Sequence, residues 1–307
     1  MFAGESPPSA RAHYKTASLS PCKIAYGDTG DIACDAYHRY ETDLALLKEL
    51  GVKAYRFSTS WARIDPSGDG TWNEAGLSYY DKVVDLCLQY GIVPYLTLYH
   101  WELPQALQDR GGWLSRETAE AFGRYAGKVA AHFRNRVKHY FTLNEPQCTT
   151  SLGYNIYNGH AVRAAGSGYE FVPKYPGFPR TALKWPVTPE VLDWGVRYLQ
   201  ERYGLPGYIT ENGLSCNDRV YLDGKVHDGE RIDFLARYLN CLSRAVESGA
   251  DIRGYFHWAL TDNLEWHSGY GDRFGLIYVD FPTLTRIPKD SFYWYQRVIR
   301  SGDPESR

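Results

Sequence analysis

A helix that ends at glycine and is followed at once by a short, β-rich segment recurs along the chain. Four copies read LLKELG-VKAYRFS, CLQYG-IVPYLTLYH, YLQERYG-LPGYITEN and AVESG-ADIRGYFHWA, and a fifth, HFRNR-VKHYFTLNE, lacks the glycine. Glycine just past a helix adopts the left-handed conformation that caps it, and the aromatic and β-branched residues that follow suit a buried strand. Alternating helices and continuous apolar strands predict a parallel sheet with covered faces.

Two helix starts carry their own signals. Asn73 precedes the segment EAGLSYYDKVVDL and is expected to be its N-cap, because a short polar side chain can accept hydrogen bonds from the free backbone amides of a first helical turn. Thr188, Pro189 and Glu190 read as cap, first helical proline and acidic first turn of a second helix.

The predicted strands end in polar and aromatic residues, which in chain order are Arg56, His100-Trp101, Asn144-Glu145, Glu211-Asn212, and Trp258 followed by Asp262-Asn263. Such groups at the carboxyl ends of parallel strands build the active site of a (β/α) barrel. A doubly wound sheet would gather them at its switch point, but it usually carries a glycine-rich phosphate loop. Neither GxGxxG nor GxxxxGK[ST] is present, so nucleotide binding is disfavoured.

Two of these strand ends share one arrangement. TLNEPQ at 142–147 and ITENG at 209–213 each place a glutamate where a strand gives way to a loop. A single glutamate there would most simply accept hydrogen bonds from loop amides. Two in the same context predict a pair of carboxylates for acid–base and nucleophilic chemistry.

Charge and cysteine usage limit the class of protein. The formal net charge is −2, from 34 basic and 36 acidic residues, which disfavours a nucleic-acid binder. The 26 tyrosines and nine tryptophans fit either an aromatic core or a sugar-stacking cleft. Six scattered cysteines without CxxC or Cys/His spacing predict free thiols and no metal site. With no apolar leader and no 18-residue apolar run, the expectation is a cytoplasmic protein without membrane contact.

At these residues the chain resembles family 1 glycoside hydrolases, the β-glucosidase family. The matching segments include KAYRFSTSWARI, YLTLYHWELPQAL, TLNEP, KWPVTP, YITENGL, GYFHWALTDNLEWHSGY and RFGLIYVDF, and NEP together with ITENG is highly specific. The resemblance implies a (β/α)8 barrel that hydrolyses β-linked glucosides with retention and without any cofactor. It also implies that Glu145 is the acid/base and Glu211 the nucleophile.

Further roles follow from the same resemblance. Arg56 is expected beside the nucleophile, Asn144 on the sugar 2-hydroxyl, and Glu265 and Trp266 of NLEW on the outer hydroxyls. The alternative for Glu265 is a solvated loop charge. His100 is either a sugar ligand or a satisfied core histidine. The rings of Trp101 and Trp258 are sugar platforms or barrel-mouth packing, and Trp185 matches an aglycone-side position or is plain packing.

The barrel is expected to be incomplete. Apart from the 66 residues between Glu145 and Glu211, these polar strand ends recur about every 45 residues, so eight units would need ~360 residues where the chain has 307. Five strands can be placed, but the family's first strand and its fifth and sixth units are not found. The missing units would include the tyrosine of an NYY-type motif, which hydrogen-bonds the nucleophile in the family. Gln147 stands where many members have a tryptophan after NEP. Either the chain is a shortened relative or internal segments are missing from this sequence.

The resulting prediction is a single (β/α)-barrel domain over 1–307, with an irregular segment at 1–26 and an irregular loop at 158–186. Unpaired strand edges of an incomplete barrel would invite self-association. The leading function is a retaining β-glucosidase. The alternative is a catalytically weak remnant that binds sugars or another chain.

Overall fold

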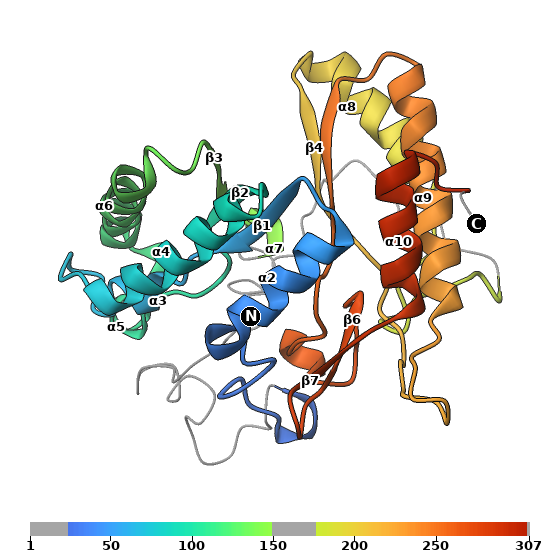
Figure 1. Cartoon of the computed structure of the whole chain (residues 1–307). Coiled ribbons are helices and arrows are strands. Elements are labelled where there is room, and N and C mark those ends of the chain that lie inside the picture. Colours follow the sequence, from blue (N-terminus) through green and yellow to red (C-terminus); the bar gives the residue numbers. More distant parts are fainter. Residues whose placement is uncertain (1–23, 149–175, 306–307) are drawn as a thin grey trace. The chain divides into compact units, whose positions relative to one another are not determined.

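The structure, a computed structural model, describes residues 24–148 and 176–305, which group into two compact units (Figure 1). The larger unit contains residues 24–53 and 178–305, and the smaller unit contains 54–148 with 176–177. Within these ranges, no helix has the length and apolar character needed to cross a membrane.

The smaller unit is built on a three-stranded parallel sheet in the order β1-β2-β3. The strands are β1 (Ala54–Ser58), β2 (Val93–Tyr99) and β3 (His139–Leu143). Its helices are α3 (Trp61–Ile64), α4 (Glu74–Gln89), α5 (Gln105–Asp109), η2 (Gly112–Leu114), α6 (Arg116–Phe133) and α7 (Pro146–Cys148). In register, Arg56 lies opposite Tyr95 and Tyr99 opposite Leu143, so the carboxyl ends of the three strands share one edge.

An aromatic cluster fixes that edge of the smaller unit. Trp61 is fully buried and stacks on Tyr125, with ring centroids 5.2 Å apart. The Tyr125 hydroxyl lies 2.6 Å from the hydroxyl of Thr59 and donates to the carbonyl of Leu98 at 3.0 Å. Because Thr59 follows β1 and Leu98 lies near the end of β2, one buried phenol holds both strand ends in place.

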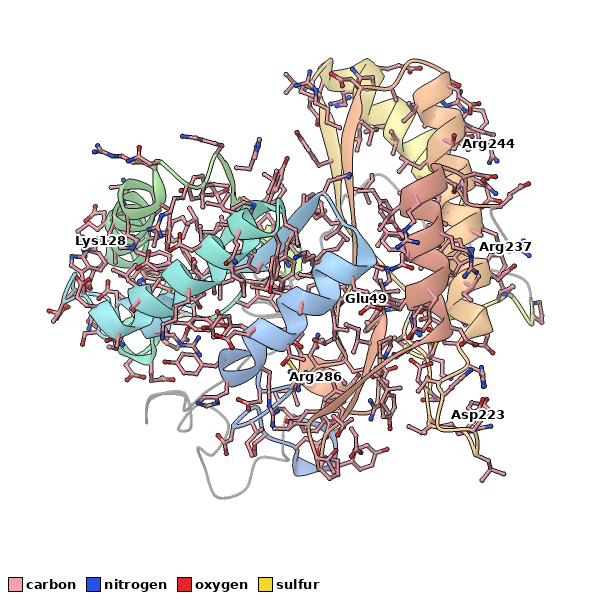
Figure 2. The ribbon with its side chains drawn as sticks, in the orientation of Figure 1. Glu49, Lys128, Asp223, Arg237, Arg244 and Arg286 are labelled. Carbon is pink, nitrogen blue, oxygen red and sulfur yellow. The ribbon has the colours of Figure 1, made fainter. Side chains whose placement is uncertain are left out.

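Ion pairs join α4 to α6 and to the turn that follows α6, on the outside of the smaller unit. Arg136 Nη1 lies 2.9 Å from Asp85, and Lys128, labelled in Figure 2, lies 3.5 Å from Glu74. Exposed pairs of this kind contribute only ~0–1 kcal/mol each, so the buried aromatic cluster does most to hold the unit together.

The larger unit contains a parallel pair, β4 (Gly207–Asn212) and β5 (Ile252–His257), and an antiparallel hairpin, β6 (Ile277–Asp280) and β7 (Thr285–Pro288). Its helical segments are η1 (Ala25–Gly27), α2 (Ala36–Leu50), the π-helix η4 (Val191–Gly195), α8 (Val196–Tyr203), α9 (Gly229–Glu247), η5 (Trp266–Ser268) and α10 (Asp290–Ser301).

Helix α9 covers the core of the larger unit with one apolar face. Phe234, Tyr238 and Cys241 are buried at helical spacing, and the core cluster also includes Phe292 of α10. Figure 1 shows α9 and α10 side by side, whereas Arg237 and Arg244 lie on the exposed side of α9 in Figure 2.

The five predicted strands are confirmed as β1 to β5. The four glycines expected to cap helices all have positive φ: 83° at Gly51, 72° at Gly91, 62° at Gly204 and 99° at Gly249. Asn73 is the N-cap of α4, as predicted, but its side chain makes no capping hydrogen bond; its Nδ2 donates to the Arg63 carbonyl at 2.9 Å.

The helix predicted to begin at Pro189, with Thr188 as its cap, begins instead at Val191, with Glu190 as its N-cap, so that prediction was wrong by two residues. The Thr188 and Pro189 carbonyls accept from the amides three residues on, at 3.2 and 3.0 Å, and this makes a turn before the π-helix. The Thr188 amide donates to the Tyr238 hydroxyl at 2.9 Å, which ties the turn to α9.

The strand that precedes Glu145 and the strand that contains Glu211 belong to different sheets, because β3 pairs with β2 and β4 pairs with β5. This confirms the expectation that they are not hydrogen-bonded neighbours. Of the predicted irregular loop, 176–186 consists of turns and one bridge, between Arg180 and Pro186. Residues 158–175, and 1–23 of the predicted amino-terminal segment, lie outside the described part.

Candidate active site

Asn144 is the centre of a hydrogen-bonded array at the carboxyl edge of the smaller unit's sheet. Its side-chain oxygen accepts from Arg56 Nη2 at 2.6 Å, and its side-chain nitrogen lies 3.2 Å from His100 Nε2. Its carbonyl accepts from Trp101 Nε1 at 3.0 Å, and its amide donates to the Tyr99 carbonyl at 2.9 Å. The structure therefore brings together Arg56, His100, Trp101 and Asn144; of the residues expected to share one cleft, Arg56, His100 and Asn144 meet here, and the place of Glu265 in that cleft stays a prediction.

His100 is neutral in this array. Burial, with the nearby positive charge of Arg56, lowers the pKa of His100 from its ordinary value near 6.5 to about 3. With the Asn144 amide oriented as above, Nε2 of His100 accepts a hydrogen bond, so its proton lies on Nδ1. A neutral imidazole with a fixed tautomer suits hydrogen bonding to a sugar hydroxyl.

Glu145 directly follows Asn144 and is exposed. Its φ is +40°, in the left-handed region that residues other than glycine rarely adopt. The cost of such a backbone is of order 1–3 kcal/mol, and strain of this kind clusters at functional sites. The Glu145 carbonyl accepts from the Cys148 amide at 2.9 Å, so the turn into α7 fixes the backbone from which the carboxyl group projects.

Glu211 lies in β4 and is half-buried, one residue before the strand ends. The Asn212 carbonyl accepts from the Trp258 amide at 3.0 Å, which continues the β4–β5 pairing past β5. A Cβ on Gly213 would lie 1.8 Å from the Trp258 carbonyl oxygen, so only glycine permits this approach. The glycine of ITENG therefore brings the chain at Trp258 against the strand that contains Glu211.

Tyr255 is a site-supporting residue that the sequence analysis did not identify. Its hydroxyl donates to Asn212 Oδ1 at 2.8 Å, which orients the residue next to Glu211. The sequence signal for Tyr255 was its position, two residues before the polar end of β5 on a strand rich in aromatic residues. From sequence alone, a tyrosine in such a strand is interpreted as a core residue, because the hydrogen-bond partner of its hydroxyl group is not known.

The loop with NLEW is a tight turn in the larger unit. The Glu265 amide donates to the Gly269 carbonyl at 2.7 Å, and the Ser268 amide donates to the Glu265 carbonyl at 2.8 Å. Trp266 has φ +38°, and both Glu265 and Trp266 are half-buried. Trp185 is 58% exposed, so it is not packing in a core.

The ten predicted site residues thus divide between the units. The smaller unit holds Arg56, His100, Trp101, Asn144 and Glu145, and the larger unit holds Trp185, Glu211, Trp258, Glu265 and Trp266. The separation of ~5 Å between the two glutamate carboxyl groups, which a retaining mechanism requires, stays a prediction.

Replacing Asn144 with alanine tests the array. We expect kcat/KM for an aryl β-glucoside to fall about 100-fold, because Arg56 and His100 lose their common partner and the sugar loses a 2-hydroxyl contact. The 2-deoxyglucoside should lose less than tenfold relative to wild type. Thr142→Ala, at an exposed position of the same strand, is the control. Equal losses on both substrates would contradict the 2-hydroxyl assignment.

A second histidine, the half-buried His257 of β5, predicts a pH-dependent stability. Both ring nitrogens of His257 are buried, and burial lowers the pKa of His257 from near 6.5 to about 3, although the Phe274 and Asn212 backbone favours the charged form. Between those values the unfolded chain binds a proton that the folded chain does not. The free energy of unfolding should therefore fall as pH drops from 6.5 toward 3, by up to about 1.4 kcal/mol per unit from this group.

His257→Phe should make that slope shallower without abolishing it, since His100 contributes in the same direction. Urea titrations at several pH values between 7 and 4 measure both slopes. Identical slopes for wild type and variant would show that His257 is not held neutral in the folded state.

Comparison with known proteins adds the remaining evidence. The family model for glycosyl hydrolase family 1 matches residues 9–168 and 161–304. β-Glucosidase A of Thermotoga maritima is 32% identical over 95% of this chain and 92% of that protein. A bifunctional β-D-glucosidase/β-D-fucosidase of Bifidobacterium breve is 34% identical over 89% of each.

Solved structures agree. The family 1 β-glucosidase of Thermotoga maritima has a TM-score of 0.88 at 31% identity, over 98% of this chain and 93% of that one. The same enzyme in complex with deoxynojirimycin has a TM-score of 0.88 at 30% identity, with the same coverage. These likenesses confirm the predicted α/β barrel class. The alignment with β-glucosidase A runs over 411 positions, which exceeds the 307 residues of the chain, so the shortening is confirmed.

Proposed function

Because the chain belongs to glycosyl hydrolase family 1, a family of retaining glycosidases, we propose that it hydrolyses terminal β-linked glucosides through Glu145 and Glu211. The observation that carries the proposal is the Arg56–Asn144–His100 array, which lies directly before Glu145 at the carboxyl end of a parallel sheet. Such a strand end is where a barrel enzyme places its catalytic groups.

The reaction proceeds in two displacements. The ionised carboxylate of Glu211 attacks the anomeric carbon, while the carboxylic acid of Glu145 protonates the departing glycosidic oxygen. The sugar is then bound to Glu211 as an ester. Glu145, now a carboxylate, takes a proton from water, and the resulting attack on the anomeric carbon releases the sugar with its original β-configuration.

The surrounding residues supply orientation and charge. Asn144 donates to the 2-hydroxyl, where hydrogen bonds strengthen as the oxocarbenium-like transition state forms. Neutral His100 binds a further hydroxyl, and Arg56 favours the charged form of the nucleophile. Glu265 and Trp266 contact the outer hydroxyls, and the carboxylate of Glu265 disfavours a 6-phosphorylated sugar by charge repulsion. Trp101, Trp185 and Trp258 offer aromatic faces to the sugar and aglycone.

The names of the relatives support a glucoside as substrate. Two are a β-glucosidase and a β-D-glucosidase/β-D-fucosidase, and the structural relative binds the sugar analogue deoxynojirimycin. An assay with an aryl β-glucoside tests the proposal, with the α-anomer as control. We expect turnover of the β-anomer alone, at a rate below that of β-glucosidase A, since the NYY-type tyrosine is absent.

We further propose that the protein self-associates. Apolar residues that are more than half exposed line η4, α8 and the segment to β4: Val191, Trp194, Tyr198, Leu199, Tyr203 and Leu205. Strand β4 lies at the edge of its two-stranded sheet, since β5 is its partner within the described residues. An exposed apolar face beside an open strand edge favours pairing with a second copy of the chain.

Light scattering coupled to size exclusion tests this. Wild type should elute as a dimer or larger species at micromolar concentration, and Trp194→Asp should shift it to monomer, because a charge in an apolar contact is costly to desolvate. Arg237→Asp, on the exposed side of α9, is the control and should leave the species unchanged. A monomeric wild type would contradict the proposal.

A cytoplasmic location is proposed on the cysteines. Cys34, Cys87, Cys216 and Cys241 are free thiols in the described part of the chain, and all four are buried. Free thiols persist in reducing compartments. Cell fractionation tests the location, and recovery from the extracellular fraction would contradict it.

A further inference from the structure

A cluster of buried charge lies beneath the NLEW loop in the larger unit. The Lys289 ammonium is 0% exposed and lies 2.8 Å from Asp262 Oδ1 and 2.5 Å from Asp218 Oδ2. Asp262 is itself 0% exposed and accepts from Arg273 Nη1 at 2.7 Å. Arg231, also fully buried, is paired with Asp218 at 2.8 Å and with Asp228.

Asp262 connects this charge to the loop backbone. Besides the two cations, its carboxylate accepts from the amides of Gly275, at 2.9 Å, and Val279, at 3.4 Å. Its own amide donates to the Ile277 carbonyl at 3.0 Å. Every lone-pair direction of the carboxylate therefore faces a donor, and the residue immediately before Asn263 is fixed on both side chain and backbone.

The backbone before the loop is held by pairing with the segment that leads into β6. The Ala259 amide donates to the Phe274 carbonyl at 3.2 Å, and the Leu276 amide donates to the Ala259 carbonyl at 3.0 Å. A Cβ on Gly275 would lie 2.2 Å from the Asp262 amide nitrogen, so glycine is needed for this approach.

The far side of the loop is also anchored. Asp28 Oδ2 accepts from the Tyr270 amide at 3.0 Å, and the Tyr270 hydroxyl donates to the Thr29 carbonyl at 2.7 Å. The segment with Glu265 and Trp266 therefore runs between two fixed points, Asp262 and Tyr270.

Stability alone gives a weak reason for such a cluster. Removing an ammonium and a carboxylate from water carries a desolvation penalty that their attraction repays only when the geometry is excellent, and an apolar pair of similar volume is often as stable. Unlike an apolar pair, charged partners fix the orientation of a side chain, because each carboxylate oxygen of Asp262 must face its own hydrogen-bond donors.

We propose that Asp262 and Lys289 are positioning residues that preset the Asn263–Trp266 loop and thereby set the preference for sugars with a full complement of outer hydroxyls. The inference rests on the proposed function, because it takes Glu265 and Trp266 as ligands of those hydroxyls. Lys289 also pairs with Asp218, which lies in the segment between β4 and α9. It therefore couples the loops that follow β4 and β5.

The test compares aryl β-glucoside with aryl β-xyloside, which lacks the exocyclic hydroxymethyl group. For Asp262→Asn and Lys289→Met we expect the glucoside-to-xyloside ratio of kcat/KM to fall about tenfold, mainly through a higher KM for the glucoside. The double variant Asp262→Asn/Lys289→Met restores the charge balance and should fold where a single variant does not. It should still show the lower ratio, because the directional contact is gone.

The control is another buried ion pair of the larger unit. Arg286 (Figure 2) binds Asp43 through two nitrogens, at 2.9 and 3.1 Å, and joins β7 to α2. Arg286→Met should lower the thermal midpoint and leave the sugar ratio unchanged. If the Asp262 and Lys289 variants likewise lose stability with an unchanged ratio, the cluster is merely structural and the proposal is overturned.

Hydrogen–deuterium exchange of the wild-type protein decides the matter if no variant folds. A preset loop predicts slow exchange of the Glu265 amide within it, which donates to the Gly269 carbonyl, and of the Asp262 amide before it, without sugar and comparable to β4 and β5. Rapid exchange that slows only with a glucose-like inhibitor would overturn the proposal. Because this arm needs no turnover, it stands even if wild type fails to hydrolyse glucosides, an outcome that would contradict the proposed function alone.

Discussion

Glu211→Ala is expected to lower kcat/KM for aryl β-glucosides by on the order of 10⁴-fold or more, which corresponds to about 5 kcal/mol of transition-state stabilisation. The loss is large because no covalent intermediate can form without the nucleophilic carboxylate. The variant should fold, since Glu211 lies next to the strand end and outside the apolar core.

Small anions separate this role from a structural one. Azide can occupy the space left by the Glu211 carboxylate, attack the anomeric carbon from that side and give an α-glucosyl azide in a single displacement. We expect azide to restore turnover with an activated aryl glucoside, and the product's configuration can be measured by NMR. A Glu211→Ala variant that keeps more than about a tenth of wild-type activity would exclude it as nucleophile.

Glu145→Ala is the second large effect. Losing general acid–base catalysis typically costs 10²–10⁴-fold, and we expect about 10³-fold for a glucoside whose leaving group needs protonation. For an activated leaving group such as dinitrophenolate, the first displacement should be nearly unchanged and the second, in which water attacks, should limit the rate. A burst of phenolate followed by slow turnover is therefore expected.

The pH dependence gives an independent readout of Glu145. The basic limb of the kcat/KM profile should disappear in Glu145→Ala, because that limb reports loss of the general acid's proton. Azide should in this case yield a β-glucosyl azide, by attack on the intermediate from the side that water normally uses. A basic limb that persists in the variant would assign it to another group.

Helices and parallel strands were predictable because their signals are local. The apolar strand after each capping glycine located β1, β2, β4 and β5, and the positive φ of the four glycines shows that the cap is the physical basis of the pattern. The β6–β7 hairpin was not predicted: its strands have four residues each, too few for an alternating pattern to stand out. The late start of the helix after Thr188 reflects a turn that a capping signal cannot distinguish from a first helical turn.

Part of the candidate site was equally predictable. That Arg56, His100 and Asn144 would meet follows from parallel strands whose carboxyl ends share an edge. The contacts of Asp262 and Lys289 were not predictable, since residues 27 positions apart pair only because a hairpin returns the chain to the loop. Tyr255 was missed for a related reason, because its role depends on the side chain of Asn212, 43 residues away.

The central claim is that this shortened chain is still a retaining enzyme. The most direct test follows the hydrolysis of an aryl β-glucoside by proton NMR, from the first minute, before glucose mutarotates. The account predicts that β-glucose forms first and the α-anomer appears later, at the spontaneous rate. Initial release of α-glucose would contradict the double displacement through Glu145 and Glu211, and the absence of any glucose signal would contradict the assignment of activity itself.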